Sequence, residues 1–183
     1  NTHSLAAQVR RVGGIPQVLP LARDSREATC ELIERGLECD LLLVSGGVSA
    51  GRYDVVEEVL ADLGAEFYFD RVLIRPGQPT VFGRARGVFF FGLPGNPVST
   101  MVTFEIFARA GLELLGGQSQ ATLPLLLARL TEDFRHKPGL TRFLPARLGP
   151  GGSEFTPIPW QGSSDVFAVA RANAWLVAEA DRE

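Results

Sequence analysis

Two glycine-rich segments contain the residues best suited to bind an anion. The segments are Ser45-Gly46-Gly47-Val48-Ser49-Ala50-Gly51-Arg52-Tyr53-Asp54 and Gly92-Leu93-Pro94-Gly95-Asn96-Pro97-Val98-Ser99. Each follows an apolar run typical of a buried strand and leads into a helical pattern. Glycine lets backbone N–H groups converge on a ligand, and the helix N-terminus adds its positive end. In an open α/β sheet, both loops would lie at the carboxyl ends of strands, where ligands bind.

A simpler interpretation of either loop alone is a tight strand-to-helix turn, in which Pro97 takes the first helical position. Two such loops in one domain favour a binding site. Neither loop matches GxxxxGK[ST] or GxGxxG, so the sequence does not support a nucleoside triphosphatase or a dinucleotide enzyme.

Arg71 and Arg75 lie between the two loops, four positions apart on what we interpret as a strand that ends in a rigid turn. Even spacing along a strand places both on one face. Two guanidiniums on one face repel each other unless an anion lies between them, and arginine suits a tetrahedral oxyanion. The alternative is a solvated edge paired with Asp70 or Glu66.

Asp54 and Asp24 are the carboxylates best placed to act. Asp54 ends the first loop, where it could hold Mg²⁺ against a phosphate, because Mg²⁺ takes one or two carboxylates and keeps waters. The competing role for each aspartate is the N-cap of the following helix. His3 and His136 have no partner at metal-ligand spacing.

Alternating helices and strands are predicted for about the first 115 residues, which is typical of a doubly wound α/β domain. The first helix has its apolar stripe on Leu5, Val9 and Val12 and a cap at Thr2 or Ser4. The second is capped by Asp24 or Ser25. The remaining predicted helices are 55–63 and 98–115, and the predicted strands are 15–20, 41–44, 67–74, 80–82 and 88–91.

The pattern changes after a linker at residues 116–120. Short strands at 125–130, 142–148, 155–158 and 174–177, separated by Pro-Gly turns, predict a small β-rich unit. We therefore expect two domains, residues 1–117 and 118–183. Doubly wound domains normally open with a strand that carries a ligand loop. That strand is missing here, so we expect the chain to be part of a longer polypeptide.

Composition excludes some functions. The formal net charge of −3 argues against non-specific nucleic-acid binding, which needs a basic surface. Cys30 and Cys39 form no CxxC pair, which favours a reducing compartment. The uncharged stretch 87–104 contains two prolines and two glycines near its centre, so we reject it as a membrane span.

The motifs SGGVSAGRYD, RPGQP, GLPGNPVSTMVTFE and ARANAWLV, in this order and spacing, closely resemble the MoeA and gephyrin E-domain family of molybdopterin molybdotransferases. The resemblance implies a MogA-like α/β domain, a mostly parallel sheet lacking its first strand, and then a small β-barrel-like domain. It implies insertion of molybdate into adenylylated molybdopterin with release of AMP, assisted by Mg²⁺. It also implies a cytoplasmic homodimer, with a MogA-type adenylyltransferase as a possible partner.

The resemblance assigns roles to residues of this sequence. Gly46, Gly47 and Ser49 would hold the adenylate phosphates, and Asp54 the metal, with Asp24 as a second functional aspartate. Arg71 and Arg75 would hold molybdate or the phosphate of the pterin. Further residues expected at the site are Gln78, Pro94, Pro97, Ser99, Arg142, Ser163 and Ser164.

This sequence departs from the family pattern at Arg75 and Gln78, which stand where the family usually has the two lysines of KPGKP. Arginine keeps the charge with a different geometry, whereas Gln78 removes a charge. Two alternatives stay open: a MogA-like molybdopterin adenylyltransferase, which GGVS and the β-rich unit disfavour, and a dimeric scaffold of the gephyrin kind, because one fold can serve both roles.

Overall fold

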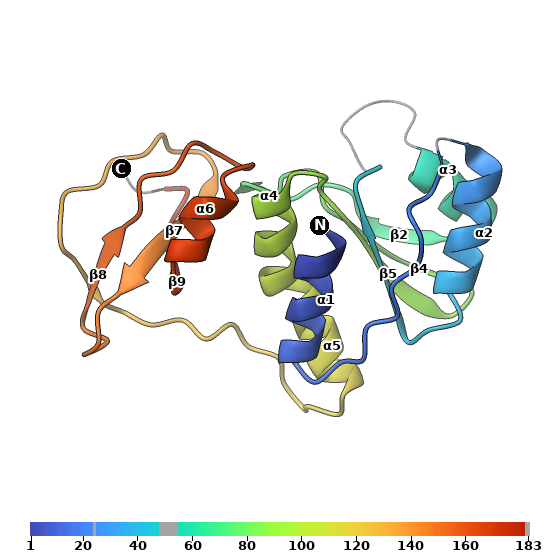
Figure 1. The fold of residues 1–183 in the computed structure, drawn as a ribbon, viewed down its shortest axis with the longest axis horizontal. Coiled ribbons are helices and arrows are strands. Elements are labelled where there is room, and N and C mark those ends of the chain that lie inside the picture. The colour runs from blue at the N-terminus through green and yellow to red at the C-terminus, as the bar shows by residue number, and fades with distance from the viewer. Residues whose placement is uncertain (24, 48–54, 182–183) are drawn as a thin grey trace.

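The computed structural model describes residues 1–23, 25–47 and 55–181. Two β-sheets lie side by side, and most of the helices surround the first (Figure 1). The chain is of the α/β class, as the sequence predicts. Among the described residues, no helix has both the length and the apolar character needed to cross a membrane.

The first sheet has the strand order β1-β5-β4-β2. Its strands are β1 (Leu41–Ser45), β5 (Val88–Leu93), β4 (Val81–Ala85) and β2 (Glu66–Phe69). Only β1 and β5 are parallel, whereas β4 is antiparallel to both of its neighbours. The expectation of a mostly parallel sheet is therefore wrong for the described strands, and the sheet is mixed. The cause is local, because Arg86 and Gly87 both have positive φ and form a two-residue turn that joins β4 to β5 as a hairpin.

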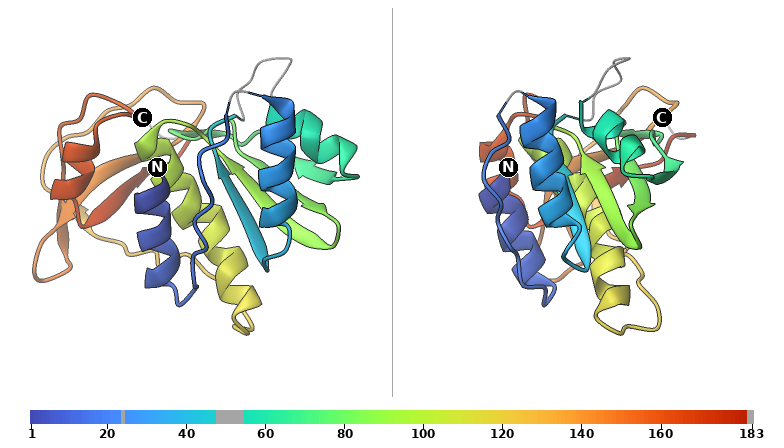
Figure 2. Two further views of the ribbon diagram at one scale, coloured as in Figure 1. Left: turned by 45° about the vertical axis from the view of Figure 1, so that its right-hand side comes forward. Right: turned by 90° about the vertical axis from the view of Figure 1, so that its right-hand side faces the viewer.

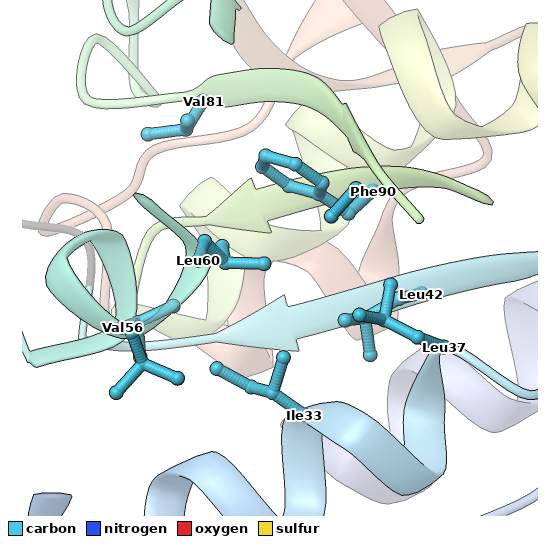
Figure 3. Packing of buried hydrophobic residues seen from close by; sticks show 9 residues of the cluster. Ile33, Leu37, Leu42, Val56, Leu60, Val81 and Phe90 are labelled. Atoms are coloured by element: carbon cyan, nitrogen blue, oxygen red, sulfur yellow. The ribbon is translucent and has the colours of Figure 1, made fainter. Parts of the chain in front are cut away.

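Helices cover both faces of this sheet (Figure 2). On one face, α2 (Arg26–Gly36) and α3 (Val55–Asp62) bury their apolar stripes against β1, β4 and β5. Figure 3 shows this core, in which Ile33 of α2 and Val56 and Leu60 of α3 gather with Leu42 and Phe90 of the sheet. On the other face lie α1 (Thr2–Arg11), α4 (Pro97–Thr103) and α5 (Arg109–Leu115).

The cap of the first helix differs from the prediction. Asn1, rather than Thr2 or Ser4, is the N-cap of α1. The cap of α2 is Ser25, whose Oγ accepts a hydrogen bond from Ala28 N at 3.2 Å, as one of the two predicted alternatives. The predicted helix 98–115 is present but is interrupted by a π-helical turn, η1 (Phe104–Ala108). Such turns insert one residue into the helical register.

Two predicted strands of the first domain are wrong in extent. Residues 15–20 have no strand partner in the part of the chain that the structure describes, and Ile15 is almost fully exposed. The predicted strand 67–74 is broken into β2 and the two-residue β3 (Ile74–Arg75), because β3 pairs with the other sheet. A strand needs a partner for its backbone groups, and that partner lies far away in sequence.

The second sheet is built around β7 (Thr141–Leu148). β3 pairs with one edge of β7 in parallel, and β8 (Glu154–Pro157) and β9 (Ala174–Ala178) pair with it antiparallel, while β6 (Arg129–Leu130) pairs with β8. The described strands do not close into a barrel. Helix α6 (Val166–Arg171) was not predicted, and only the last two residues of the predicted strand 125–130 form one.

Candidate oxyanion site

The two glycine-rich loops begin at the same edge of the first sheet. β1 and β5 are parallel neighbours in which Ser45 and Leu93 are register partners, so their carboxyl ends lie together. The amide of Gly46 donates to Leu93 O at 3.0 Å. A β carbon placed on Gly95 would lie 3.6 Å from Gly46 Cα, so the two backbones pass close to each other. The predicted common edge is confirmed.

Hydrogen bonds from the start of α1 and from α4 join these loops. Asn1 Nδ2 donates to Ser45 Oγ and to Gly95 O, both at 2.7 Å. The hydroxyl of Thr100 donates to Pro94 O at 2.5 Å and lies 3.5 Å from Ser45 Oγ. The first turn of α4 and the first residue of α1 therefore hold the two loops together.

The second loop carries three of the predicted site residues. Pro94 is buried, Pro97 is the first residue of α4 as predicted, and Ser99 is buried one turn into that helix. Asn96, the N-cap of α4, makes no side-chain bond to its own helix. Its side chain instead donates to Ser163 Oγ at 2.9 Å.

Ser163 connects the second sheet region to this loop. Its carbonyl oxygen accepts a hydrogen bond from Val98 N at 3.0 Å, so a residue from outside α4 satisfies one of the orphan donors of the helix. Ser164 follows and is exposed. Asp165 then caps α6 by accepting from Ala168 N at 3.0 Å. Hydrogen bonds from the Ala168 and Gln161 amides lower the pKa of the Asp165 carboxyl below its ordinary value.

The segment 71–80 crosses from the first sheet to the second. Arg71 lies in the connection after β2, not on a strand, so the argument that strand alternation places Arg71 and Arg75 on one face is wrong. The cause is the change of partner described above, since only Ile74 and Arg75 pair with β7. The carbonyl oxygen of Gln78 accepts from the amides of Val72 and Thr80, each at 3.0 Å, and so holds the turn.

Arg75 lies beside Arg142. The two are register partners on the parallel strands β3 and β7, and register partners on neighbouring strands lie on the same face of a sheet. Within the described part of the chain, neither guanidinium forms an ion pair. The Nε atom of Arg142 is buried and has no hydrogen-bond acceptor there. Two adjacent cations with an unsatisfied buried donor favour a bound anion.

Three predicted residues, Asp24, Ser49 and Asp54, lie outside the described residues. The ranges 1–23, 25–47 and 55–181 contain no group of three or more histidine, cysteine, aspartate or glutamate side chains that could hold a metal ion. The described residues therefore do not by themselves form a Mg²⁺ site, and we derive no chemical step through a metal.

Three residues whose side chains join the two loops were not predicted from the sequence. They are Asn1, Ser45, whose hydroxyl contacts both of the others, and Thr100. Each is a small polar residue that has an ordinary local explanation as a cap, a strand end or a helical threonine. Only the pairing of β1 with β5 brings them together, so no local signal in the sequence marks them.

Backbone loops at the ends of two adjacent parallel strands of the first sheet, together with an arginine pair on neighbouring strands of the second, define an α/β protein with groups suited to oxyanions. The chain belongs to the family described as "Probable molybdopterin binding domain", whose model matches residues 1–114. A second family model, "MoeA C-terminal region (domain IV)", matches residues 127–183.

Curated relatives carry related names. A "Molybdopterin molybdenumtransferase" of Staphylococcus epidermidis is 32% identical over 157 residues, covering 84% of this chain and 38% of that protein. One from Nostoc sp. is 34% identical over 143 residues, covering 76% of this chain and 33% of that protein. The chain thus spans well under half the length of these relatives.

A solved structure shares the arrangement of the whole chain. The crystal structure of a molybdopterin biosynthesis MoeA protein from Pyrococcus horikosii superposes with a TM-score of 0.81 at 28% identity, covering 100% of this chain and 44% of that one. Because the superposition covers the whole chain, it supports the arrangement of both sheets.

Proposed function

We propose that the protein to which this chain belongs inserts molybdate into adenylylated molybdopterin and releases AMP, as a molybdopterin molybdotransferase of molybdenum cofactor biosynthesis. Support comes from the family of the chain and from the names of its relatives, which are transferases of this pathway. A molybdate ion, an adenylate phosphate and the pterin phosphate are all oxyanions, which the loops and arginines are suited to bind.

The proposal rests mainly on one observation, that Arg75 and Arg142 lie side by side on neighbouring strands. Arg75 comes from the segment between β2 and β4 of the first sheet, whereas Arg142 comes from β7, so this cationic pair needs both parts of the chain. The β-rich second part of the chain disfavours an adenylyltransferase of the MogA type. The arginine pair therefore favours molybdate transfer over adenylyl transfer as the function.

The residues have separate roles in this proposal. The backbone N–H of Gly47, with Ser49, holds the adenylate phosphates, and Gly46, whose own N–H donates to Leu93 O, shapes the loop. Asp54 would hold Mg²⁺, which would supply charge neutralisation. Arg75 and Arg142 hold molybdate beside the phosphoanhydride, and water hydrolyses the P–O–P bridge, which gives AMP and the free molybdopterin phosphate. The chain acts by positioning and by neutralising charge, with no covalent enzyme intermediate. Residues that complete the proposed site are Asp24, Arg71, Gln78, Pro94, Pro97, Ser99, Ser163 and Ser164.

The remaining expectations are parts of the same proposal. We place a domain boundary between residues 117 and 118, and we propose that the complete protein is a cytoplasmic homodimer that receives its substrate from a MogA-type adenylyltransferase. Analytical ultracentrifugation of the full-length protein tests the dimer, and a single sedimenting species of monomer mass would refute it.

The test of function uses the full-length protein, supplied with adenylylated molybdopterin, and follows AMP release with and without molybdate. We expect AMP release that depends on molybdate. An equal rate without molybdate, or no AMP with it, would refute the transferase assignment.

A matched pair of variants tests the role of the Arg75–Arg142 pair. Arg142→Gln removes one cation of the pair, and we expect kcat/KM to fall by about 10²-fold, which corresponds to roughly 2.7 kcal/mol of lost stabilisation. Arg147→Gln makes the same change on the same strand, at an exposed side chain that donates to Arg171 O. We expect it to retain full activity. Equal losses in both variants would contradict the role given to Arg142.

A further inference from the structure

We propose that Thr100 is a positioning residue, whose hydroxyl sets the spacing between the two loops that hold substrate. The inference rests on the proposed function and deepens it. Thr100 was not among the predicted site residues, and it lies in the first turn of α4, fully buried behind the edge where the loops begin.

The number of protons on each group shows which group donates and which accepts in the hydrogen bonds around Thr100. One atom of the Asn1 side chain, Nδ2, contacts both Gly95 O and Ser45 Oγ. Because a carbonyl oxygen can only accept, that atom is the amide nitrogen, and it also donates to Ser45. The hydroxyl of Thr100 has one proton, and the acceptors within reach of it are two carbonyl oxygens, Pro94 O at 2.5 Å and Asn96 O at 3.0 Å. Thr100 must therefore accept from Ser45, and the chain runs from Asn1 through Ser45 and Thr100 to Pro94.

This directed chain, which we call the loop clasp (Asn1, Ser45, Thr100 and Pro94), spans both loops. Ser45 immediately precedes Gly46, the first residue of one loop, and Pro94 immediately precedes Gly95 of the other. A β carbon on either glycine would lie within ordinary contact of the other's Cα, at 3.8 Å and 3.6 Å. The clasp thus fixes the separation of two backbones that pass close to each other.

The inner part of the clasp is shielded from water, because Thr100 is fully buried and so is its hydrogen bond to Pro94 O. Losing the Thr100 hydroxyl leaves Pro94 O without this donor, while Ser45 Oγ keeps its bond from Asn1 Nδ2 and loses its contact with Thr100. The two loops would then be free to shift relative to each other. A shift of about 1 Å in bound reactants can cost about 10²-fold in rate.

The test compares Thr100→Val with Thr103→Val in the full-length protein. Both threonines are fully buried in α4, and both donate to helix carbonyl oxygens. Only the Thr100 hydroxyl also contacts the loops, whereas that of Thr103 bonds Ser99 O and Thr100 O. The two substitutions are the same chemical change, one turn of helix apart.

We expect Thr100→Val to lower kcat for molybdate-dependent AMP release by about tenfold or more, with KM for adenylylated molybdopterin changed less than about threefold. Thr103→Val should lower the unfolding midpoint by a similar amount and leave kcat near the wild-type value. Equal kcat in the two variants, at either the wild-type or a reduced level, overturns the proposal.

Ser45→Ala provides a second test that does not depend on Thr100→Val folding. It removes the donor to Thr100, and we expect the same loss of kcat as for Thr100→Val. The double variant should lose no more than either single variant, because both changes break one chain. Losses that multiply would show that the two hydroxyls act independently and would overturn the clasp.

The two proposals fail in different ways. A wild-type protein that shows no molybdate-dependent AMP release refutes the proposed function. The clasp is then judged by urea unfolding alone, in which non-additive losses for Ser45→Ala and Thr100→Val support it and additive losses refute it. An active wild type with an unaffected Thr100→Val variant refutes only the clasp.

Discussion

Asn96, at the start of α4, donates a hydrogen bond to Ser163 Oγ at 2.9 Å, and the carbonyl oxygen of the same serine accepts from Val98 N. Ser163 comes from the segment between β8 and α6, so the second sheet region supplies the cap that Asn96 does not give its own helix. The join between the two parts of the chain therefore lies beside the loop that begins at Gly92.

Asn96→Ala should loosen this join without unfolding either part, because the bond from Val98 N remains. We expect a loss of about 1 kcal/mol in the free energy of unfolding. The only two tryptophans, Trp160 and Trp175, pack in the second sheet region. Urea unfolding followed by tryptophan fluorescence and by far-ultraviolet circular dichroism checks the effect, and an unchanged midpoint in both signals would show that the bond contributes nothing.

Gly77 should not tolerate a side chain. Its φ is +112°, and a β carbon there would lie 2.4 Å from Thr103 Cγ2. Gly77→Ala is expected to lose about 2–4 kcal/mol from backbone strain and overpacking together. Gly139→Ala is the control, since Gly139 has φ of +103° with nothing within 4 Å and so has the backbone strain alone. Chemical denaturation should rank Gly77→Ala below Gly139→Ala, and the reverse order would contradict the packing.

Asp165 should make stability depend on pH in acid. Hydrogen bonds from the amides of Ala168 and Gln161 lower the pKa of its carboxyl below the ordinary value of 3.8. Because the folded pKa is below the unfolded one, its stabilising effect is complete above pH 3.8 and disappears as the pH falls through the folded pKa. Asp165→Ala should therefore be less stable than the wild type at pH 6, and the difference should shrink at pH 3. A difference that is constant with pH would exclude this carboxylate as the source.

Phe90→Ala should show how strongly the first sheet depends on its core. Phe90 is fully buried between the sheet and the helices α2 and α3, and its ring lies edge-on to Phe67 at a centroid distance of 5.6 Å. Truncation is expected to cost about 3–5 kcal/mol. Phe167→Ala, at a ring that is 80% exposed, should cost little, and thermal unfolding of both variants checks the contrast.

Several helices and strands could be predicted from the local sequence pattern. The apolar run that became β1, the cap of α2 at Ser25, the helix α3, and Pro97 at the first position of α4 were predicted because each depends on near neighbours in the sequence. The short helix α6 was missed, although Asp165 is a suitable N-cap, because six residues contain too few turns for an apolar period to be recognised.

Strand pairing was harder to predict. The pattern at 67–74 reads as one strand, yet Phe69 ends a strand of the first sheet and Ile74 begins one in the second. Residues 15–20 have strand-like composition and no strand partner among the described residues. Composition records whether a segment suits a pleated surface, and it does not record which other segment is near.

By itself, the sequence determined the α/β class, the two glycine-rich loops and the residue types suited to oxyanions, because these depend on local composition and order. Tertiary structure decided that Gly46 and Gly95 lie close together, that Arg75 lies beside Arg142 rather than sharing a strand with Arg71, and that Thr100 connects the loops. These relations join residues up to dozens of positions apart. They exist only once parallel pairing of β1 with β5, and of β3 with β7, has fixed the register.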